Sequence, residues 1–390
     1  MVAQVINLSP HETFRYYCDR YQVSNGSYFY GNFGLELRHL SWKEAESIFN
    51  YLAYNKEKVY QRNDDEKSVN LLLTGSMRKL KSVANRLSYE SFERLSLKIF
   101  DTIKFFENYE LTDYNIGNKQ FTFNKAYVMG ILNVTPDSFS EKGLFFDRSK
   151  AVARGIRIID GGADILDIGG ESSRPGAESI DAKLELERII PVLIKIKERR
   201  PDAIISVDTV KKQVAKKALE NGAHIINDIS GGLHEPEMLD IVAEYDAAYV
   251  IMHMKGIPKN MQDNPVYDEL IADVFDFLYN QIKVAKEKGI RRIIIDPGIG
   301  FGKTVDDNFN LLDRLGDFKS LSHPILVGVS RKSFIGKTLD LEVEKRDKPT
   351  SILESLALEK GARIIRTHNI KNGVMVRDLF NKTVKSSVDD

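Results

Sequence analysis

Eight short apolar runs alternate with amphipathic stretches over the last two thirds of the chain. The runs are rich in β-branched residues and continuous, which is typical of strands buried on both faces of a parallel sheet. Helical patterns follow them, for example over 182–200 and 266–289, where apolar residues return every three or four positions. Glycines near the helix ends, such as Gly162, Gly222, Gly289 and Gly361, favour a left-handed turn into the next strand. The apolar runs cover residues 126–134, 163–170, 204–209, 224–230, 247–254, 292–298, 325–330 and 363–369.

This alternation constrains the fold class. Eight strand–helix units in about 265 residues are typical of a closed (β/α)8 barrel. A doubly wound open sheet is the alternative, because periodicity does not show whether a sheet closes. We therefore expect an α/β protein in which residues 121–390 form a TIM barrel, preceded by a small mixed α/β N-terminal domain over residues 1–120.

The N-terminal segment has its own pattern. Residues 68–75 predict a strand, and residues 76–87 and 90–109 predict helices. The polar stretch 109–120 contains Gly117 and indicates a linker. No role for this segment follows from its residues.

Composition narrows the class of partner. Lys and Arg together number 56, as do Asp and Glu, and the sequence pI is near 7.1. This balance gives no reason to expect a nucleic acid or an anionic membrane as partner. Cys18 is the single cysteine, so no intrachain disulfide is possible, which fits a reducing compartment. We expect a cytoplasmic protein without a signal peptide or a membrane span.

Polar residues end nearly every predicted strand. In a barrel these positions meet at the carboxyl end, where active sites lie. The acids Asp208 and Asp296 and the amide Asn227 would hold a flat heterocycle with an N–C–N edge. A cationic group from the last two strands, together with Asn133, indicates an anion such as a diphosphate as ligand. That group comprises Arg331, Lys332, Arg366 and His368.

Other motifs exclude some enzyme classes. The stretch 298–304 reads GIGFGKT, but Pro297 stands where a phosphate-binding loop requires glycine, which argues against an ATPase. The zinc motifs HExxH and CxxC and the hydrolase motif GxSxG are absent from the sequence. His253 and Asp228 are interpreted as a core histidine and a loop brace.

Taken together, the motifs resemble the dihydropteroate synthase family. The resemblance spans residues 126–390 in the family's order. The motifs are MGILNVTPDSFSEKG (129–143), DIGGESSRPGAE (167–178), SVDT (206–209), INDISGG (226–232), MHMKGIPKNMQ (252–262), DPGIGFGK (296–303), GVSRKSFIG (328–336) and RTHN (366–369).

The resemblance implies a reaction and its partners. The family condenses 6-hydroxymethyl-7,8-dihydropterin diphosphate with 4-aminobenzoate, which gives dihydropteroate and pyrophosphate and requires Mg²⁺. It implies a homodimer, folate biosynthesis and a sulfonamide target. Three positions depart from the family: Ser173 and Asn369, where Thr and Asp are common, and Lys255, where Gln is common.

The resemblance also assigns roles by position. The catalytic residues would be Asp208, Lys332, Arg366 and His368. The pterin would be held by Asp208, Asn227, Ile229, Met252, Asp296, Lys332 and Arg366. The diphosphate would be held by Asn133, Arg366 and His368, with Asn133 also helping to place Mg²⁺. The aminobenzoate pocket would be shaped by Phe139, Ser173, Arg174, Pro175, Phe301, Lys332 and Ser333.

Three other functions stay open from the sequence. A pterin-dependent methyltransferase would share the pterin-binding acids, but the SRK motif, the Arg366–His368 pair and the TPDSFS loop together favour the synthase. A non-catalytic pterin-binding paralogue is disfavoured by the intact Asn133, Asp208 and Lys332. A synthase that uses a modified aminobenzoate is a third alternative.

Overall fold

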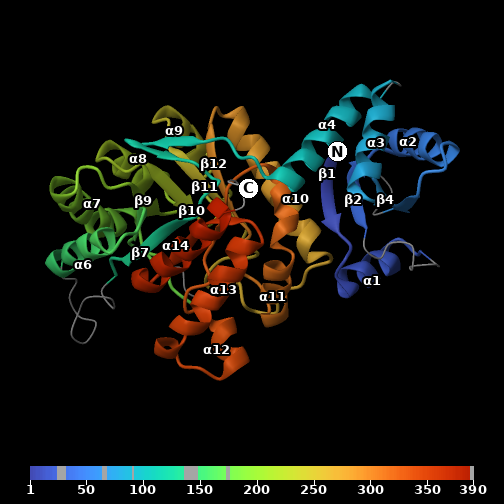
Figure 1. Cartoon of the computed structure of the whole chain (residues 1–390). Coiled ribbons are helices and arrows are strands. Elements are labelled where there is room, and N and C mark those ends of the chain that lie inside the picture. Colours follow the sequence, from blue (N-terminus) through green and yellow to red (C-terminus); the bar gives the residue numbers. More distant parts are fainter. Residues whose placement is uncertain (24–31, 64–67, 90–91, 136–147, 173–175, 387–390) are drawn as a thin grey trace. The chain divides into compact units, whose positions relative to one another are not determined.

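The computed structural model describes residues 1–23, 32–63, 68–89, 92–135, 148–172 and 176–386 (Figure 1). Contacts between residues divide the chain into two compact units. The first comprises Met1–Glu110 and Gly316–Ser322, and the second comprises Leu111–Leu315 and His323–Asp390.

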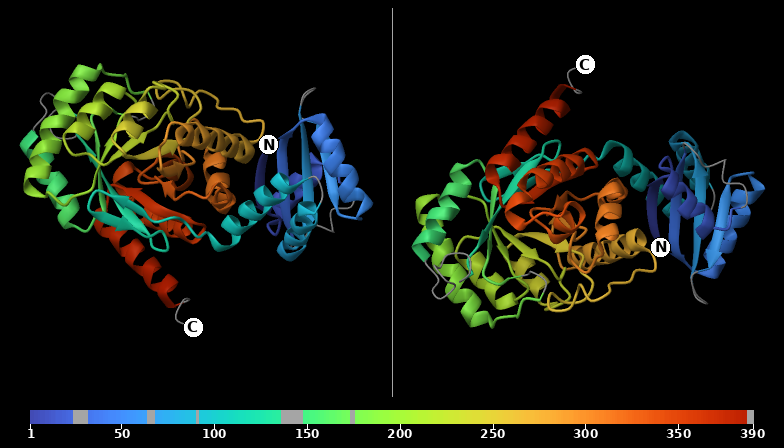
Figure 2. Two further views of the ribbon diagram at one scale, coloured as in Figure 1. Left: turned by 90° about the horizontal axis from the view of Figure 1, so that it is seen from above. Right: turned by 90° about the horizontal axis from the view of Figure 1, so that it is seen from below.

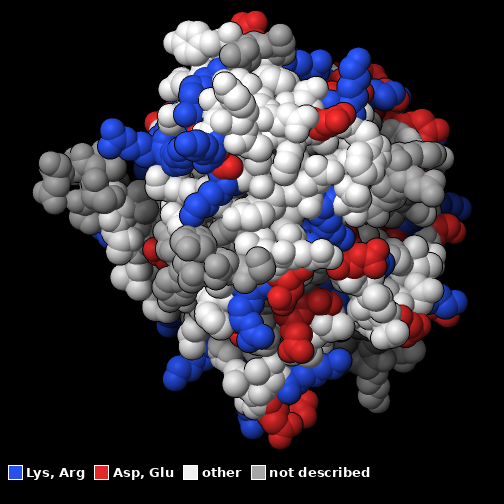
Figure 3. Space-filling model, turned by 90° about the vertical axis from the view of Figure 1, so that its right-hand side faces the viewer, with Lys and Arg blue, Asp and Glu red and all other residues white. Residues whose placement is uncertain are grey.

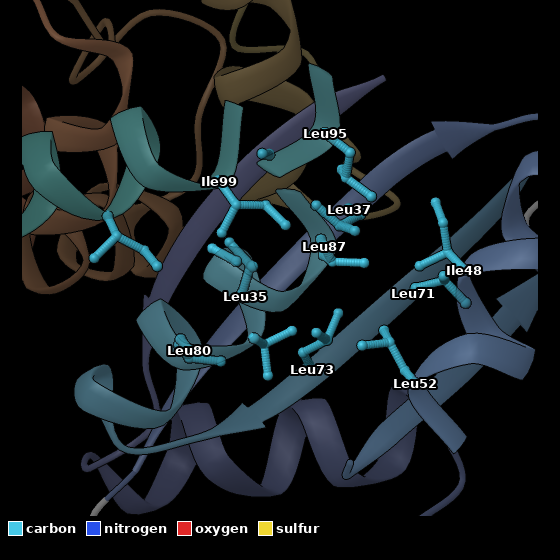
Figure 4. Close-up of a cluster of buried hydrophobic side chains, with 14 of the residues drawn as sticks. Leu35, Leu37, Ile48, Leu52, Leu71, Leu73, Leu80, Leu87, Leu95 and Ile99 are labelled. Carbon is cyan, nitrogen blue, oxygen red and sulfur yellow. The ribbon is translucent and has the colours of Figure 1, made fainter. Parts of the chain in front are cut away.

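The first unit is built on a four-stranded antiparallel sheet in the order β1-β2-β4-β3. Alternating apolar residues of the strands face α2, α3 and α4, and Figure 4 shows Leu35, Leu37, Leu71 and Leu73 in this core. A second cluster joins the other face of the sheet to α1. The predicted strand over 68–75 and both predicted helices are confirmed. The elements are β1 (Val2–Asn7), α1 (His11–Arg20), β2 (Phe33–Leu40), α2 (Trp42–Tyr54), β3 (Val59–Asn63), β4 (Val69–Gly75), α3 (Met77–Ser88) and α4 (Glu93–Asn108).

The second unit is a closed barrel of parallel strands in the order β10-β11-β12-β13-β14-β7-β8-β9. Closure confirms the expected (β/α)8 architecture and excludes the open doubly wound sheet. Figures 1 and 2 show the helices around the ring of strands. The strands are β7 (Tyr127–Asn133), β8 (Ile165–Gly169), β9 (Ile205–Asp208), β10 (Ile225–Asp228), β11 (Ala248–Met252), β12 (Arg292–Asp296), β13 (Ile325–Val327) and β14 (Ala362–Thr367). The helices are α6 (Arg148–Asp160), α7 (Ala182–Arg199), α8 (Lys212–Glu220), α9 (Met238–Glu244), α10 (Leu270–Glu287), α11 (Val305–Asp313), α12 (Ser333–Leu339), α13 (Asp347–Glu359) and α14 (Ile370–Ser386).

A hairpin packs against the apolar interior of the barrel. Its strands β5 (Tyr114–Ile116) and β6 (Lys119–Phe121) pair antiparallel. Tyr114, Phe121 and Phe123 share one core with inward-facing residues of all eight barrel strands or of the turns that lead into them. The prediction of a linker over 109–120 is therefore wrong for most of its length. The stretch is polar overall, but its alternate apolar residues are buried against the barrel.

This hairpin predicts where the chain can be cut. Phe121 and Phe123 are almost wholly buried, and burial of each ring contributes about 1.5–3 kcal/mol to stability. We expect a truncated chain that begins at residue 111 to keep a cooperative unfolding transition, and one that begins at residue 124 to lose much of its stability. Thermal unfolding of the two truncations measures the difference. Equal midpoints would mean that the hairpin does not support the barrel.

The inward face of the barrel follows from the alternation of side chains along a strand. Ile165, Ile225, Ile294 and Ile364 belong to the apolar core beside the hairpin. Because side chains two positions apart share a face, the next inward residues on these strands are polar. They are Asp167, Asn227, Asp296 and Arg366.

The predicted glycine turns are confirmed by the backbone. Gly162, Gly222, Gly289 and Gly361 have φ values of +95°, +94°, +92° and +116°, in the region that favours glycine. No helix among the described residues is both long and apolar enough to cross a membrane. On the face shown in Figure 3, basic and acidic side chains are interspersed, in keeping with the equal numbers of the two.

Candidate active site

The registers of the strands bring the predicted site residues to one end of the barrel. Asn133 pairs with Gly169, Gly169 with Asp208, and Asp208 with Asn227 across four neighbouring strands. A Cβ atom at Gly169 would lie 3.8 Å from Asn133 Oδ1 and 3.9 Å from Asp208 Oδ2, so these two oxygens flank the glycine. On the other side of the barrel, Met252 pairs with Asp296.

Arg366 is the centre of the site. It leaves β14 and reaches across the barrel, where its Nε donates to Asp167 Oδ2 at 2.7 Å and an NH2 group donates to Asp208 Oδ2 at 2.8 Å. Asn227 Nδ2 donates to the same oxygen of Asp167 at 3.2 Å. Charged hydrogen bonds of this kind are stronger than neutral ones, and they fix the plane of the guanidinium group.

Asp167 is a site residue that was not identified from the sequence. It lies within the quoted motif DIGG, but a carboxylate in the middle of a buried strand gave no sign of its partners. The alternation of side chains along β8 could have found it, because Asp167 lies two residues before Gly169 on the inward face.

The pKa values of Asp208 and Lys332 are both shifted from their usual ranges. Burial raises the pKa of Asp208 to about 7, against the opposing charge of Arg366, and the negative charge of Asp167 adds to the rise. Burial lowers the pKa of Lys332 to about 7, although Asp296 favours its charged form. Perturbed acids and bases that gather in one place are typical of functional sites.

The loop after β12 joins three predicted residues. Asp296 Oδ1 accepts a hydrogen bond from the Gly298 amide at 2.7 Å. Lys332 donates to the carbonyl of Ile299, and its Nζ lies 4.1 Å from the centre of the Phe301 ring. Asp296, Lys332 and the Phe301 ring are therefore held together by one short loop.

A buried lysine anchors this loop. Lys303 Nζ lies 3.0 Å from the Phe301 carbonyl oxygen and 3.0 Å from His253 Nδ1. Burial lowers the pKa of His253 well below its usual range, and the Lys303 charge lowers it further. His253 is therefore a core residue, as interpreted from the sequence, and the lysine of GIGFGKT holds a loop.

Hydrogen bonds connect the segments that follow β13 and β14. Ser330 Oγ accepts from the His368 amide at 3.1 Å and lies 3.0 Å from His368 Nδ1. Asp347 accepts from Arg331 at 2.6 and 2.9 Å and from Asn369 Nδ2 at 2.8 Å. Asp347 therefore supplies a negative charge beside Asn369, the position where the family commonly has aspartate.

The remaining predicted residues are placed as follows. Ile229 and Met252 are buried, and Ser333 is exposed at the start of α12. Asp228 accepts from Ser230, Gly232 and Tyr249, which confirms that it braces its loop. Four predicted residues lie outside the described part of the chain: Phe139, Ser173, Arg174 and Pro175.

Comparisons with known proteins agree with this geometry. The family described as pterin binding enzyme matches residues 129–368. The chain is 43% identical over 271 residues to the dihydropteroate synthase of Synechocystis, which covers 67% of this chain and 93% of that protein. It is 42% identical over 262 residues to the Escherichia coli enzyme, which covers 67% and 92%.

Solved structures give the same result. The dihydropteroate synthase of Yersinia pestis in a sulfonamide drug complex has a TM-score of 0.66 at 37% identity, and covers 70% of this chain and 100% of that one. The Xanthomonas albilineans enzyme with 4-aminobenzoic acid has a TM-score of 0.64 at 39% identity, and covers 72% and 98%.

The fold and the site thus define a pterin-binding enzyme built on a (β/α)8 barrel. Within that class, the chain belongs to the dihydropteroate synthase family.

Proposed function

We propose that this chain condenses 6-hydroxymethyl-7,8-dihydropterin diphosphate with 4-aminobenzoate, which forms dihydropteroate and pyrophosphate in folate biosynthesis. The observation that carries the proposal is the position of Arg366 between Asp167 and Asp208, beside Asn227. This arrangement supports the proposal because acceptors that suit an aminopyrimidine edge lie beside a cation that suits a leaving diphosphate. The names of the relatives agree with it.

The pterin is held by charge and by shape. Asp208, Asn227 and Asp296 supply acceptors for its amino and ring N–H groups, and the guanidinium plane of Arg366 can stack on the ring. Ile229 and Met252 contribute apolar contacts. Asp208 also stabilises the positive charge that develops on the pterin methylene carbon as pyrophosphate departs.

The leaving group meets the cationic side of the site. Arg366, His368 and Lys332 stabilise the negative charge that accumulates on the pyrophosphate, and Asn133 offers it a donor. The amine of 4-aminobenzoate is neutral near pH 7 and can attack without a strong base. Catalysis then depends on how the site positions this amine against the pterin methylene carbon. Its pocket would be formed by Phe139, Ser173, Arg174, Pro175, Phe301, Lys332 and Ser333.

The site suits a Mg²⁺ ion that binds mainly through the phosphates of the substrate. Among the described residues, no group of three or more His, Cys, Asp or Glu side chains could hold a metal ion. Mg²⁺ keeps several waters and commonly binds through substrate phosphates, so one amide oxygen from Asn133 is a sufficient protein contribution. When bound, the ion would neutralise charge on the diphosphate.

The test is pyrophosphate release by the purified chain, with the product identified by mass. Dihydropteroate should form only when the dihydropterin diphosphate, 4-aminobenzoate and Mg²⁺ are all present. Tight pterin binding without turnover would contradict the proposed acceptor.

The activity should depend on pH in a defined way. Below about pH 7 Asp208 gains a proton and loses its charge, and above about pH 7 Lys332 loses its proton. We therefore expect kcat/KM to pass through a maximum near neutral pH. Lys332→Arg should remove the alkaline limb and keep the acidic limb, because a guanidinium group stays charged. An unchanged alkaline limb in this variant would mean that Lys332 does not carry it.

We also propose that the enzyme is a cytoplasmic homodimer. Four large apolar side chains are about half exposed or more on two packed helices of the barrel, α13 and α14: Ile352 (55%), Leu356 (49%), Met375 (52%) and Leu379 (64%). Exposed apolar side chains in such a group are typical of a protein interface. Light scattering after gel filtration gives the molar mass that decides between monomer and dimer.

A further inference from the structure

Asp167 binds two different groups through a single oxygen. The residue has no exposed surface, and its Oδ2 accepts from both Arg366 Nε and Asn227 Nδ2. Its Oδ1 is buried and has no hydrogen-bond partner among the described residues. Asp167 therefore makes its side-chain contacts to the substrate pocket through Arg366 and Asn227.

The hydrogen bond between Asp167 and Asn227 fixes the orientation of the Asn227 amide. An ionised carboxylate only accepts hydrogen bonds, so the Asn227 atom that faces Asp167 must be the nitrogen. The oxygen of the Asn227 amide then points away from Asp167. One N–H of the amide is used by Asp167, and no side chain among the described residues is bonded to the second N–H or to the oxygen, so both can serve a ligand. Asn227 therefore offers a donor and an acceptor in a fixed order.

Arg366 keeps Asp167 from turning away. Its Nε and NH2 groups bridge Asp167 and Asp208, which lie on the neighbouring strands β8 and β9, and both carboxylates are held by one rigid guanidinium group. Rotation of Asp167 would break this bridge as well as the bond to Asn227.

We propose that Asp167 is a positioning residue that selects a 2-aminopteridine over a 2,4-dioxopteridine by fixing the Asn227 amide. This inference rests on the proposed function. A 2-aminopteridine presents a ring-nitrogen acceptor beside an amino donor, which matches the N–H and the oxygen of Asn227. A 2,4-dioxopteridine presents an N–H donor beside a carbonyl acceptor, which is the reverse order and matches only a flipped amide.

The experiment compares two probes on the full-length chain. The dissociation constants of 6-hydroxymethylpterin and of 6-hydroxymethyl-2,4-dioxopteridine are measured by calorimetry for the wild type and for Asp167→Asn. Neither oxygen of a carboxylate can donate, so no rotation of Asp167 admits a flipped Asn227 amide. An asparagine at 167 admits it when its nitrogen faces Asn227, at the cost of the bond to Arg366 Nε, which shares the same Asp167 oxygen. We expect the preference for the pterin to fall by about tenfold, the effect of one mismatched buried hydrogen bond.

Asp228→Asn is the matched control. Asp228 is also a fully buried carboxylate, but its partners are Ser230, Gly232 and Tyr249. We expect this control to keep the wild-type preference even where it lowers stability. If Asp167→Asn does not fold, Asp167→Ser, which can also both donate and accept, serves for the same comparison.

The outcomes separate the two proposals. Weaker binding of both probes by the same factor, or no change in either, would overturn the role of Asp167 and leave the synthase proposal standing. A wild-type chain that binds neither pterin nor its diphosphate would overturn the proposed function itself.

Discussion

Asp208→Asn is expected to lower kcat/KM by about 10²–10³-fold, which is the scale of removing one electrostatic contact to a developing charge. The substitution keeps the shape of the side chain and removes its charge. The NH2 group of Arg366 then faces a neutral amide in place of the carboxylate at 2.8 Å, and the electron-poor pterin loses a compensating charge. Steady-state rates at saturating 4-aminobenzoate measure the effect, and a variant with a near-normal rate would exclude this role.

Asp164→Asn is the control for this prediction. Asp164 also accepts from an arginine at 2.8 Å, Arg377, and its side chain is 14% exposed against 15% for Asp208. It lies before β8, and it accepts from the amide of Val128 near the opposite end of the barrel. We expect this variant to unfold at a lower temperature and to keep its rate, which separates loss of stability from loss of catalysis.

The position of the site could be predicted from the sequence because parallel strands share a direction. A polar residue that ends a buried strand meets the other strand ends once the barrel closes, whatever the intervening helices do. Asp208, Asn227 and Arg366 were identified on this ground, and the structure brings them together. The resemblance to a family added chemical roles to these positions.

Pairings across the barrel could not be predicted in the same way. Arg366 and Asp167 are 199 residues apart, and they meet only because closure places β14 two strands from β8. The bond of Asn369 to Asp347 depends on where α13 begins, which no sequence pattern indicates. The hairpin at 114–121 escaped notice because three-residue strands give too short a period to detect.

The glycines of GIGFGKT show that the usual role of a motif can be excluded from the sequence while its actual role stays unassigned. As a phosphate-binding loop the stretch fails, and its glycines then have no explanation from the sequence. In the structure Gly298 has a φ of +73°, and a Cβ atom there would lie 1.8 Å from the carbonyl oxygen of His253. The backbone must approach that carbonyl so that its own amide can reach Asp296.

Gly298→Ala is therefore expected to reduce both stability and pterin binding. The left-handed conformation costs about 1–2 kcal/mol for a residue with a Cβ, and forced overpacking typically adds about 1–3 kcal/mol. Denaturant unfolding measures the sum. Gly289→Ala is the matched control, because Gly289 has a φ of +92° but its Cβ would meet nothing within 4 Å. The control should show the conformational cost alone.

The difference between these two variants isolates the close approach to His253. If it is large, the clash must be relieved by moving the 298–303 loop, which carries the amide that binds Asp296 and the carbonyl that binds Lys332. Pterin affinity should then fall in Gly298→Ala and not in Gly289→Ala. Equal unfolding energies would mean that the loop shifts without cost, and that the glycine does not hold the pterin acid in place.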